Sequence, residues 1–370
     1  MLARLYVDNY RCLVNFEFQP TRKQLIIGSN GTGKSTVLDV LSLLRDFSCR
    51  GIDCDNRLVG ETKTRWQPGV EKQRFELVVD GNGTNYTYTL QLIEWGTPAR
   101  PKVLEESVVC DGKPVFRFIE GEVHLYNDDH QDKVQYEFDW HRSALATIQE
   151  RWDNKKLTWF KRWLGSLFHV RINPWAMSAR SEQESREPSR DLGNFADWYR
   201  HLLLDNSTSV HQAISDLKEA IYGLESLDAK EAGLNVRMIQ AGIRGEKQRI
   251  VSQYALNDLS DGQRAIIALY MLMHCGISNE STLLIDEPDN FLALAEIQPW
   301  LIKLLDRVEE QNAQIILVSH HPELLNQLAG QGGMVFDRPE GFHVRVKRFD
   351  TSDDSGLTPA EIVARGWESV

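Results

Sequence analysis

The sequence predicts an α/β protein: a mixed sheet flanked by helices, an antiparallel β subdomain and an inserted helical lobe. A short apolar strand at 25–27 runs into a glycine-rich loop and then into a segment with helical spacing. Apolar strands at 282–285 and 314–318 alternate with helical segments, which is typical of a parallel sheet. Between these two parts, the pattern changes from strands to helical periodicity at about residue 141.

The first 120 residues are predicted to be rich in strands. Residues 3–7 and 12–18 alternate in polarity around a turn at 8–11, and a helix follows the glycine-rich loop at 36–44. Two hairpins come next, because turn residues separate two pairs of strand patterns: 74–80 from 85–93 at Asp80-Gly81-Asn82-Gly83, and 103–110 from 114–118 at Asp111-Gly112.

Residues 141–250 are expected to form the helical lobe. One helical stripe comprises Leu145, Ile148, Trp152, Trp159 and Trp163, and a second runs from 210 to 224 after a cap at Ser207 or Thr208. Helices at 261–273 and 297–310 then return to the α/β pattern. The expected organisation is a discontinuous head at 1–140 and 251–350, the inserted lobe at 141–250 and a tail at 351–370.

Composition narrows the class of protein. The chain has 370 residues, and 42 Lys and Arg against 53 Asp and Glu give a net charge of −11, the opposite of a protein that binds nucleic acid by bulk charge. The five scattered cysteines support neither a disulfide framework nor a zinc site. Since no stretch approaches ~18 apolar residues and the N-terminus lacks a leader pattern, we expect a cytoplasmic protein that contacts no membrane.

The strongest motif is Gly28-Ser29-Asn30-Gly31-Thr32-Gly33-Lys34-Ser35, which lies between a predicted strand and a predicted helix. Backbone N–H groups of such a loop wrap a polyphosphate, the lysine reaches the terminal phosphates and the serine binds Mg²⁺. We therefore expect ATP and Mg²⁺ as ligands. The predicted contacts are made by Asn30, Gly31, Gly33, Lys34, Ser35 and Thr36.

A second motif, Thr282-Leu283-Leu284-Ile285-Asp286-Glu287-Pro288, is an apolar strand that ends in two carboxylates. Asp286 is predicted to hold the Mg²⁺ together with Ser35, and Glu287 to polarise the attacking water. An acidic pair after a strand is by itself more often a helix cap. Its combination with the phosphate loop favours catalysis.

Two further motifs indicate a family. Leu259-Ser260-Asp261-Gly262-Gln263 opens a helix and resembles the LSGGQ signature of ABC-type ATPases, and His320 follows an apolar strand as the switch histidine of that family does. The resemblance implies that Ser260 and Gly262 contact ATP held by a second protomer, and that His320 senses the γ-phosphate. The neighbouring His321 occupies a position at which the family is more variable.

The chain resembles the SMC, RecF and OLD-like branch of these ATPases. The opening Leu5-Tyr6-Val7-Asp8-Asn9-Tyr10-Arg11 is similar to that branch's first strand, and His320-His321-Pro322-Glu323-Leu324-Leu325 to a run in OLD-like proteins. The resemblance implies a homodimer that sandwiches ATP between its heads, with a higher oligomer left open. The chain is also similar to the stand-alone, PtuA-like ATPase subunits of anti-phage defence systems.

Three departures from the family pattern qualify the resemblance. Only 50 residues follow His320, so the nuclease that OLD proteins carry is expected on a separately encoded effector, a nuclease or toxin. The segment 289–294 has Ala293 where an acidic residue or histidine is common. The glutamine that the family carries in its Q-loop is not assigned to one position in this sequence. Gln131, Gln135 and Gln149 are the candidates.

The lobe also carries a local positive charge. From 142 to 180 there are eight basic residues against two acidic ones, and six of the ten tryptophans lie between Trp140 and Trp198. Spacing favours core positions for Trp152, Trp159 and Trp163, whereas the charges form either an ordinary solvated face or an anion-binding one. A RecF-like DNA-binding ATPase in repair or recombination is therefore the alternative function.

Overall fold

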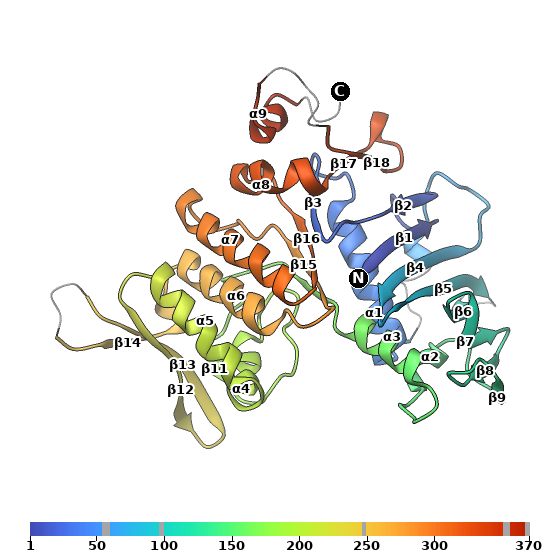
Figure 1. The fold of residues 1–370 in the computed structure, drawn as a ribbon, viewed down its shortest axis with the longest axis horizontal. Helices are drawn as coiled ribbons and strands as arrows, with labels where there is room; N and C mark the ends of the chain where they lie inside the picture. The colour runs from blue at the N-terminus through green and yellow to red at the C-terminus, as the bar shows by residue number, and fades with distance from the viewer. Residues whose placement is uncertain (54–59, 96–99, 246–248, 351–355, 367–370) are drawn as a thin grey trace.

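The computed structural model describes residues 1–370 except 54–59, 96–99, 246–248, 351–355 and 367–370. Figure 1 shows one group of strands, β1, β2 and β4 to β9, on one side of a central sheet, and α4 to α7 together with a smaller group of strands, β11 to β14, on the other. The helices are α1 (Lys34–Arg50), α2 (Ala144–Thr147), α3 (Lys155–Gly165), α4 (Phe195–Asp205), α5 (Ser207–Ala220), α6 (Asp261–Cys275), α7 (Leu294–Glu310), α8 (Pro322–Gly332) and α9 (Pro359–Ala364), with short 3₁₀ turns at 60–62, 256–258 and 339–341.

The central sheet has six strands, and its order places the phosphate loop among the acidic strand ends. In spatial order the strands are β10 (Phe168–Val170), β15 (Thr282–Asp286), β16 (Gln314–Val318), β3 (Lys23–Ile27), β17 (Gly333–Asp337) and β18 (Arg345–Arg348). All neighbouring pairs are parallel except β17 with β18. The carboxyl ends of β3, β15 and β16 therefore meet at one edge, where ligands bind in sheets of this kind.

An antiparallel sheet of eight strands forms the subdomain. Its order is β2 (Phe16–Phe18), β1 (Leu2–Asp8), β4 (Gln73–Gly81), β5 (Thr84–Trp95), β6 (Arg100–Cys110), β7 (Lys113–Ile119), β8 (Glu122–Tyr126) and β9 (Asp132–Glu137). Both predicted hairpins are present, with turns at 82–83 and 111–112. The mixed parallel sheet and the antiparallel subdomain confirm the predicted α/β class.

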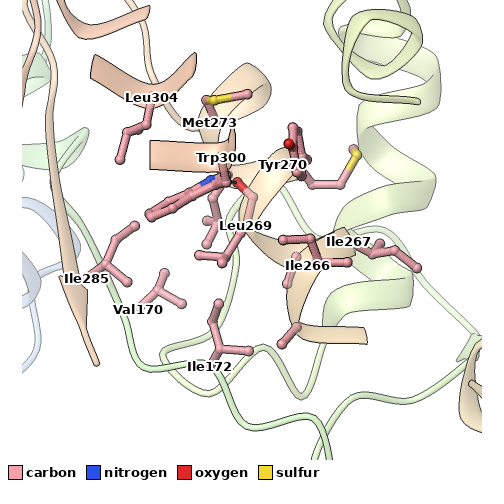
Figure 2. Close-up of a cluster of buried hydrophobic side chains, with 14 of the residues drawn as sticks. Val170, Ile172, Ile266, Ile267, Leu269, Tyr270, Met273, Ile285, Trp300 and Leu304 are labelled. Atoms are coloured by element: carbon pink, nitrogen blue, oxygen red, sulfur yellow. Dashed lines mark hydrogen bonds between the residues drawn. The ribbon is translucent and has the colours of Figure 1, made fainter. Parts of the chain in front are cut away.

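The central sheet separates two hydrophobic cores, because successive residues of a strand point to opposite faces. On β3, Ile26 packs with α1 and the antiparallel sheet, whereas Leu25 and Ile27 pack with the C-terminal helices. Figure 2 shows part of the second core, where Trp300 of α7 lies among Ile285 and side chains of α6. Its indole Nε1 donates a hydrogen bond of 3.2 Å to the Leu269 carbonyl, so the buried polar atom is satisfied.

The segment 141–250, predicted as a helical lobe, also contains strands that the sequence did not indicate. The segment contains α2 to α5, but it also contributes β10 to the central sheet and β11 (Arg180–Ser181), β12 (Leu224–Gly233) and β13 (Val236–Ile243) to a four-stranded sheet with β14 (Ser252–Ala255). The division of the chain into head, lobe and tail stays a prediction.

The first helical stripe is also interrupted. Trp152 lies between α2 and α3 and is 83% exposed, because the chain leaves the helix after α2 and Asn154 begins a new one. Trp163 is buried as predicted, and Trp159 stacks on Tyr86 with ring centroids 4.9 Å apart. The second stripe is a helix only as far as residue 220, and its N-cap is Asn206 instead of Ser207 or Thr208.

In the ranges that the structure describes, every helix is too short or too polar to span a bilayer.

Candidate nucleotide site

The phosphate loop joins the end of β3 to α1, and its backbone depends on glycine. Gly28 has φ 141°, and a Cβ atom there would lie 2.2 Å from the carbonyl oxygen of Phe336. Gly33 is the left-handed N-cap of α1, with φ 91° and no side chain to cap the helix. The first N–H groups of α1 are thus left for a ligand, and the helix dipole favours an anion there.

Lys34 begins α1 and folds back across the loop. Its ammonium group donates hydrogen bonds to the carbonyls of Gly28 and, at 3.0 Å, Ser29. Burial lowers the pKa of the Lys34 ammonium, while the nearby carboxylates of Glu287 and Asp286 oppose that shift. The lysine is therefore a cation held at the loop by exchangeable carbonyl contacts, which phosphate oxygens can replace.

Asp286 and Ser35 form the predicted metal position. Asp286 is the last residue of β15 and is 1% exposed; burial raises the pKa of its carboxyl, and a hydrogen bond from Ser35 opposes the rise. The Oδ2 atom of Asp286 is buried and has no hydrogen-bond partner. Such an oxygen beside a serine hydroxyl fits Mg²⁺, which is held by few protein oxygens and completes its shell with phosphate and water.

A site made wholly of protein ligands is not found in the described part of the chain, where His, Cys, Asp and Glu form no group of three or more that could hold a metal ion.

Glu287 follows Asp286 with a left-handed φ of 55°, and it lines the same cavity as the phosphate loop. Its backbone N–H donates to the Val318 carbonyl at 2.9 Å, which fixes this turn to β16. Its Oε2 accepts hydrogen bonds from Arg171 Nη2 at 2.6 Å and from Asn290 Nδ2 at 2.9 Å. The carboxylate is thus held in place by two donors, and one of them is a cation.

The phosphate loop and Glu287 line a cavity of about 650 Å³, which is within the size range of small-molecule sites. Its lining comprises Arg11, Cys12, Asn30, Gly31, Gly33, Lys34, Ser35, Thr36, Glu61, Lys63, Arg65, Trp66, Arg171, Glu287 and Arg338. Of the eight residues predicted to contact ATP, the six between Asn30 and Thr36 are among them, together with Glu287, whereas Ser260 and Gly262 are not. Six cations against two carboxylates suit a polyanion.

His320 lies directly after β16 and forms a hydrogen bond with the backbone of Gly28. Desolvation lowers the pKa of His320, and the Lys34 cation lowers it further. Both effects favour the neutral ring, which lies next to the phosphate loop. His321 has a different place, since its Nδ1 accepts the N–H of Glu323 and caps α8.

Ser260 and Gly262 lie outside this cavity. Ser260 is the N-cap of α6, where its hydroxyl accepts the N–H of Gln263 at 3.2 Å and the Gln263 side chain accepts the N–H of Ser260. The structure therefore brings together the phosphate loop, Asp286, Glu287 and His320, but it does not bring the signature residues to them.

Sequence reasoning missed several lining residues. The three glutamines considered from the sequence, Gln131, Gln135 and Gln149, do not line the cavity. Arg171, which directly follows β10 and contacts Glu287, does line it and was not predicted. Arg338 donates to the Gly31 carbonyl at 2.9 Å and lies over the Trp66 ring. No local signal marks these residues, since each reaches the site through long-range packing.

The basic side chains between 142 and 180 pair mostly within the chain. The contacts are Arg142 with Asp53, Arg151 with Asp153, Lys156 with the Asp128 carbonyl, Lys161 with the Ala146 carbonyl, Arg162 with Glu150, Arg171 with Glu287, and Arg180 with Glu182. One of these cations lies in the nucleotide cavity, four others pair with carboxylates, and two donate hydrogen bonds to backbone carbonyls. DNA binding by this segment stays a prediction, and these contacts do not favour it.

Comparisons with known proteins agree with the geometry. The sequence pattern of the family described as "AAA domain, putative AbiEii toxin, Type IV TA system" matches residues 25–326. The chain is similar in structure to the SMC head domain from Thermotoga maritima, with a TM-score of 0.51 and 13% identity over 95% of this chain and 99% of that one. It is also similar to an SMC head bound to the C-winged helix domain of ScpA, with a TM-score of 0.54 and 10% identity over 94% of this chain and 98% of that one.

No curated protein matches the chain. The fold is that of SMC-type ATPase heads, which confirms the predicted resemblance at the level of fold and family.

Proposed function

The chain belongs to the AAA-domain family whose pattern it matches, and from that premise we propose that it hydrolyses ATP to ADP and phosphate as one half of an ATP-sandwich homodimer. In this proposal the nucleotide state of the dimer controls a separately encoded nuclease or toxin in anti-phage defence. The toxin–antitoxin context in the family's description supports the defence role.

Each group in the cavity has a role in this reaction. The phosphate loop and Lys34 bind the β- and γ-phosphates, and Ser35 and Asp286 hold Mg²⁺, which neutralises charge that develops on the phosphate oxygens. Glu287 orients and polarises the attacking water. His320, neutral and hydrogen-bonded to the loop at Gly28, reports the γ-phosphate.

One observation carries the dimer proposal. The catalytic carboxylate and the phosphate loop share a cavity, while Ser260 and Gly262 lie at the exposed start of another helix. A helix N-terminus of this kind can bind anions. Because α6 begins outside the chain's own nucleotide cavity, phosphates bound in that cavity would not reach it. A second copy would bring its own cavity to this helix end and complete both sites.

The experiment has two arms. Purification of the tagged chain from its native operon is expected to yield a stoichiometric second protein with nuclease or toxin activity, and cells with both proteins are expected to resist phage. Lys34→Ala is expected to abolish that resistance, and Lys155→Ala, which changes a lysine outside the cavity, is expected to keep it. Purification of the chain alone, with resistance unchanged by Lys34→Ala, would contradict the proposal.

A further inference from the structure

Asp39 of α1 is a carboxylate that two arginines from distant parts of the chain share. It lies one helical turn after Ser35, on the same face of α1. Its Oδ1 is 2.7 Å from Arg190 Nη2, and its Oδ2 is 3.4 Å from Arg11 Nη1. The contact with Arg190 is an ion pair without hydrogen-bond geometry, since Asp39 Oδ1 accepts no hydrogen bond in the described part of the chain. Arg11 also lines the nucleotide cavity.

The backbone connects Arg190 to Arg171. The carbonyl of Arg190 accepts the N–H of Arg171 at 2.7 Å, and the carbonyl of Asp191 accepts the N–H of Asn173 at 3.3 Å. These two bonds fix the segment after β10 to the loop that precedes α4. The guanidinium of Arg171 contacts Glu287 at 2.6 Å. A continuous series of contacts therefore joins α1 to the carboxylate that we assign to water activation.

The loop that carries Arg190 is itself ordered. The side chain of Asn194 accepts the N–H of Ser189 at 2.7 Å and donates to the Glu187 carbonyl at 2.9 Å. Leu192, which has a left-handed φ of 60°, is fully buried in the hydrophobic core. Arg190 therefore projects from a fixed backbone, and half of its side chain is exposed.

A second contact ties β10 to α1 without competing for Asp39. The buried ring of His169 has its Nδ1 atom 3.0 Å from Ser42 Oγ and 4.0 Å from Asp39 Oδ1. Burial lowers the pKa of His169 to about 3, and the Arg190 cation contributes to that shift. The ring is therefore neutral near pH 7, and the carboxylate of Asp39 stays paired with the arginines.

We propose that Asp39 and Arg190 are positioning residues of the nucleotide site: their ion pair holds the backbone at Arg171, so that the Arg171 guanidinium meets the terminal phosphate of ATP beside Glu287. The proposal rests on the ATP site of the proposed function. It goes further, because neither Asp39 nor Arg190 is among the described residues that line the nucleotide cavity, and neither belongs to a motif that the sequence reveals.

The two ends of this ion pair have opposite charges, which separates an effect of position from an effect of charge. ATP is a polyanion, so by charge alone the loss of the Asp39 carboxylate would tighten its binding. By charge alone the loss of the Arg190 guanidinium would weaken it. If the pair acts by position, both losses weaken binding, because each one releases the backbone at Arg171. Neutralisation of Asp39 is therefore the decisive change.

The quantity to measure is the dissociation constant of a fluorescent ATP analogue with Mg²⁺, since it does not depend on hydrolysis. Asp39→Asn and Arg190→Gln are each expected to raise it by roughly threefold to tenfold. In an Arg171→Gln background, either change is expected to raise it by less than about twofold more, because residues that act through one group are not additive.

Arg50→Gln is the matched control. Arg50 also ties α1 to the loop before α4, since it pairs with Asp46 of the helix and with Glu187 of the loop. It lies away from the backbone bonds that hold Arg171, so its replacement is expected to change the dissociation constant by less than about twofold. Thermal unfolding without nucleotide is expected to be alike in all single variants, which separates weaker binding from misfolding.

The outcomes distinguish this inference from the proposed function. A dissociation constant that is unchanged or lower in Asp39→Asn would overturn the inference, as would effects of Arg190→Gln and Arg171→Gln that multiply in the double variant. If the wild type binds the analogue but does not hydrolyse ATP, the proposed reaction is wrong and the positioning role is still decided by the binding data. If the wild type does not bind it, both are wrong.

Discussion

The guanidinium of Arg171 contacts the carboxylate of Glu287, with 2.6 Å between Nη2 and Oε2, although 116 residues separate them in the chain. Arg171 directly follows β10, and Glu287 directly follows β15, and these two strands are parallel neighbours. The pairing of two strands thus places a cation against the carboxylate that we assign to water activation. The γ-phosphate carries more negative charge than this carboxylate and is expected to compete for the cation.

Replacement of Arg171 by glutamine tests that competition. Hydrogen bonds to charged groups contribute ~1.5–3 kcal/mol, so we expect Arg171→Gln to raise the KM for ATP by roughly tenfold to a hundredfold and to change kcat less. Steady-state hydrolysis measures both constants. Arg180→Gln, which removes an exposed arginine paired with Glu182, is the control; an unchanged KM in Arg171→Gln would refute the role.

Lys34 is expected to be required for nucleotide binding. With Mg·ATP at ~100 times its Kd, binding stabilises a folded protein by ~2.7 kcal/mol, so the thermal unfolding temperature of the wild type should rise. Lys34→Ala removes the cation from the phosphate loop and should abolish that rise. Differential scanning fluorimetry measures the shift, with Lys155→Ala as the control. A full shift in Lys34→Ala would exclude this binding mode.

Glu106 predicts a pH dependence of folding. It is completely buried in β6 and accepts hydrogen bonds from Ser143 at 2.6 Å and Tyr88 at 3.1 Å. Burial raises the pKa of its carboxyl above the value of 4.5 that applies to an unfolded chain. The folded state therefore binds this proton more tightly, and the resulting stability is fully present below the unfolded pKa and is lost as pH rises through the folded pKa.

Glu106→Gln removes that titration. We expect the free energy of unfolding of Glu106→Gln, relative to wild type, to increase as pH rises from the acidic range to neutrality, as measured by urea unfolding at several pH values. A difference that is constant with pH would show that Glu106 has the same pKa in both states.

Gly81 makes room for a tryptophan. A Cβ atom at Gly81 would lie 2.3 Å from the ring of Trp159, which stacks on Tyr86. Overpacking of this kind costs ~1–3 kcal/mol, so Gly81→Ala should destabilise the protein by that amount in urea unfolding. Gly165→Ala in α3 has open space, 4.0 Å from the Cys49 sulfur, and should be neutral or slightly stabilising. Equal stabilities for the two variants would contradict this packing.

The sequence was sufficient for the parts of the site that are local. The phosphate loop, the strand ending in Asp286 and the capped start of α6 are each encoded by a few consecutive residues, and all were predicted. Arg171 was not, because β10 has only three residues and its place in the sheet depends on pairing with a strand far along the chain. A short strand has no periodicity to detect.

The strands of the lobe and the exposure of Trp152 were not predicted, for a related reason. Strand β12 is half exposed, with residues such as Glu225 and Lys230 along it, so its polarity resembled a loop or a helix surface. Trp152 had helical spacing from Leu145, yet Asn154 begins a new helix and leaves the tryptophan in solvent. Caps and tertiary pairing therefore outweighed periodicity at both places.

Glu287→Gln tests the central claim most directly. The amide keeps the shape of the side chain but cannot act as a base, so hydrolysis should fall at least ~100-fold while ATP binding persists. In analytical ultracentrifugation with Mg·ATP the variant is predicted to sediment as a dimer, and as a monomer without nucleotide. Hydrolysis at the wild-type rate, or a monomer at saturating ATP, would contradict the account.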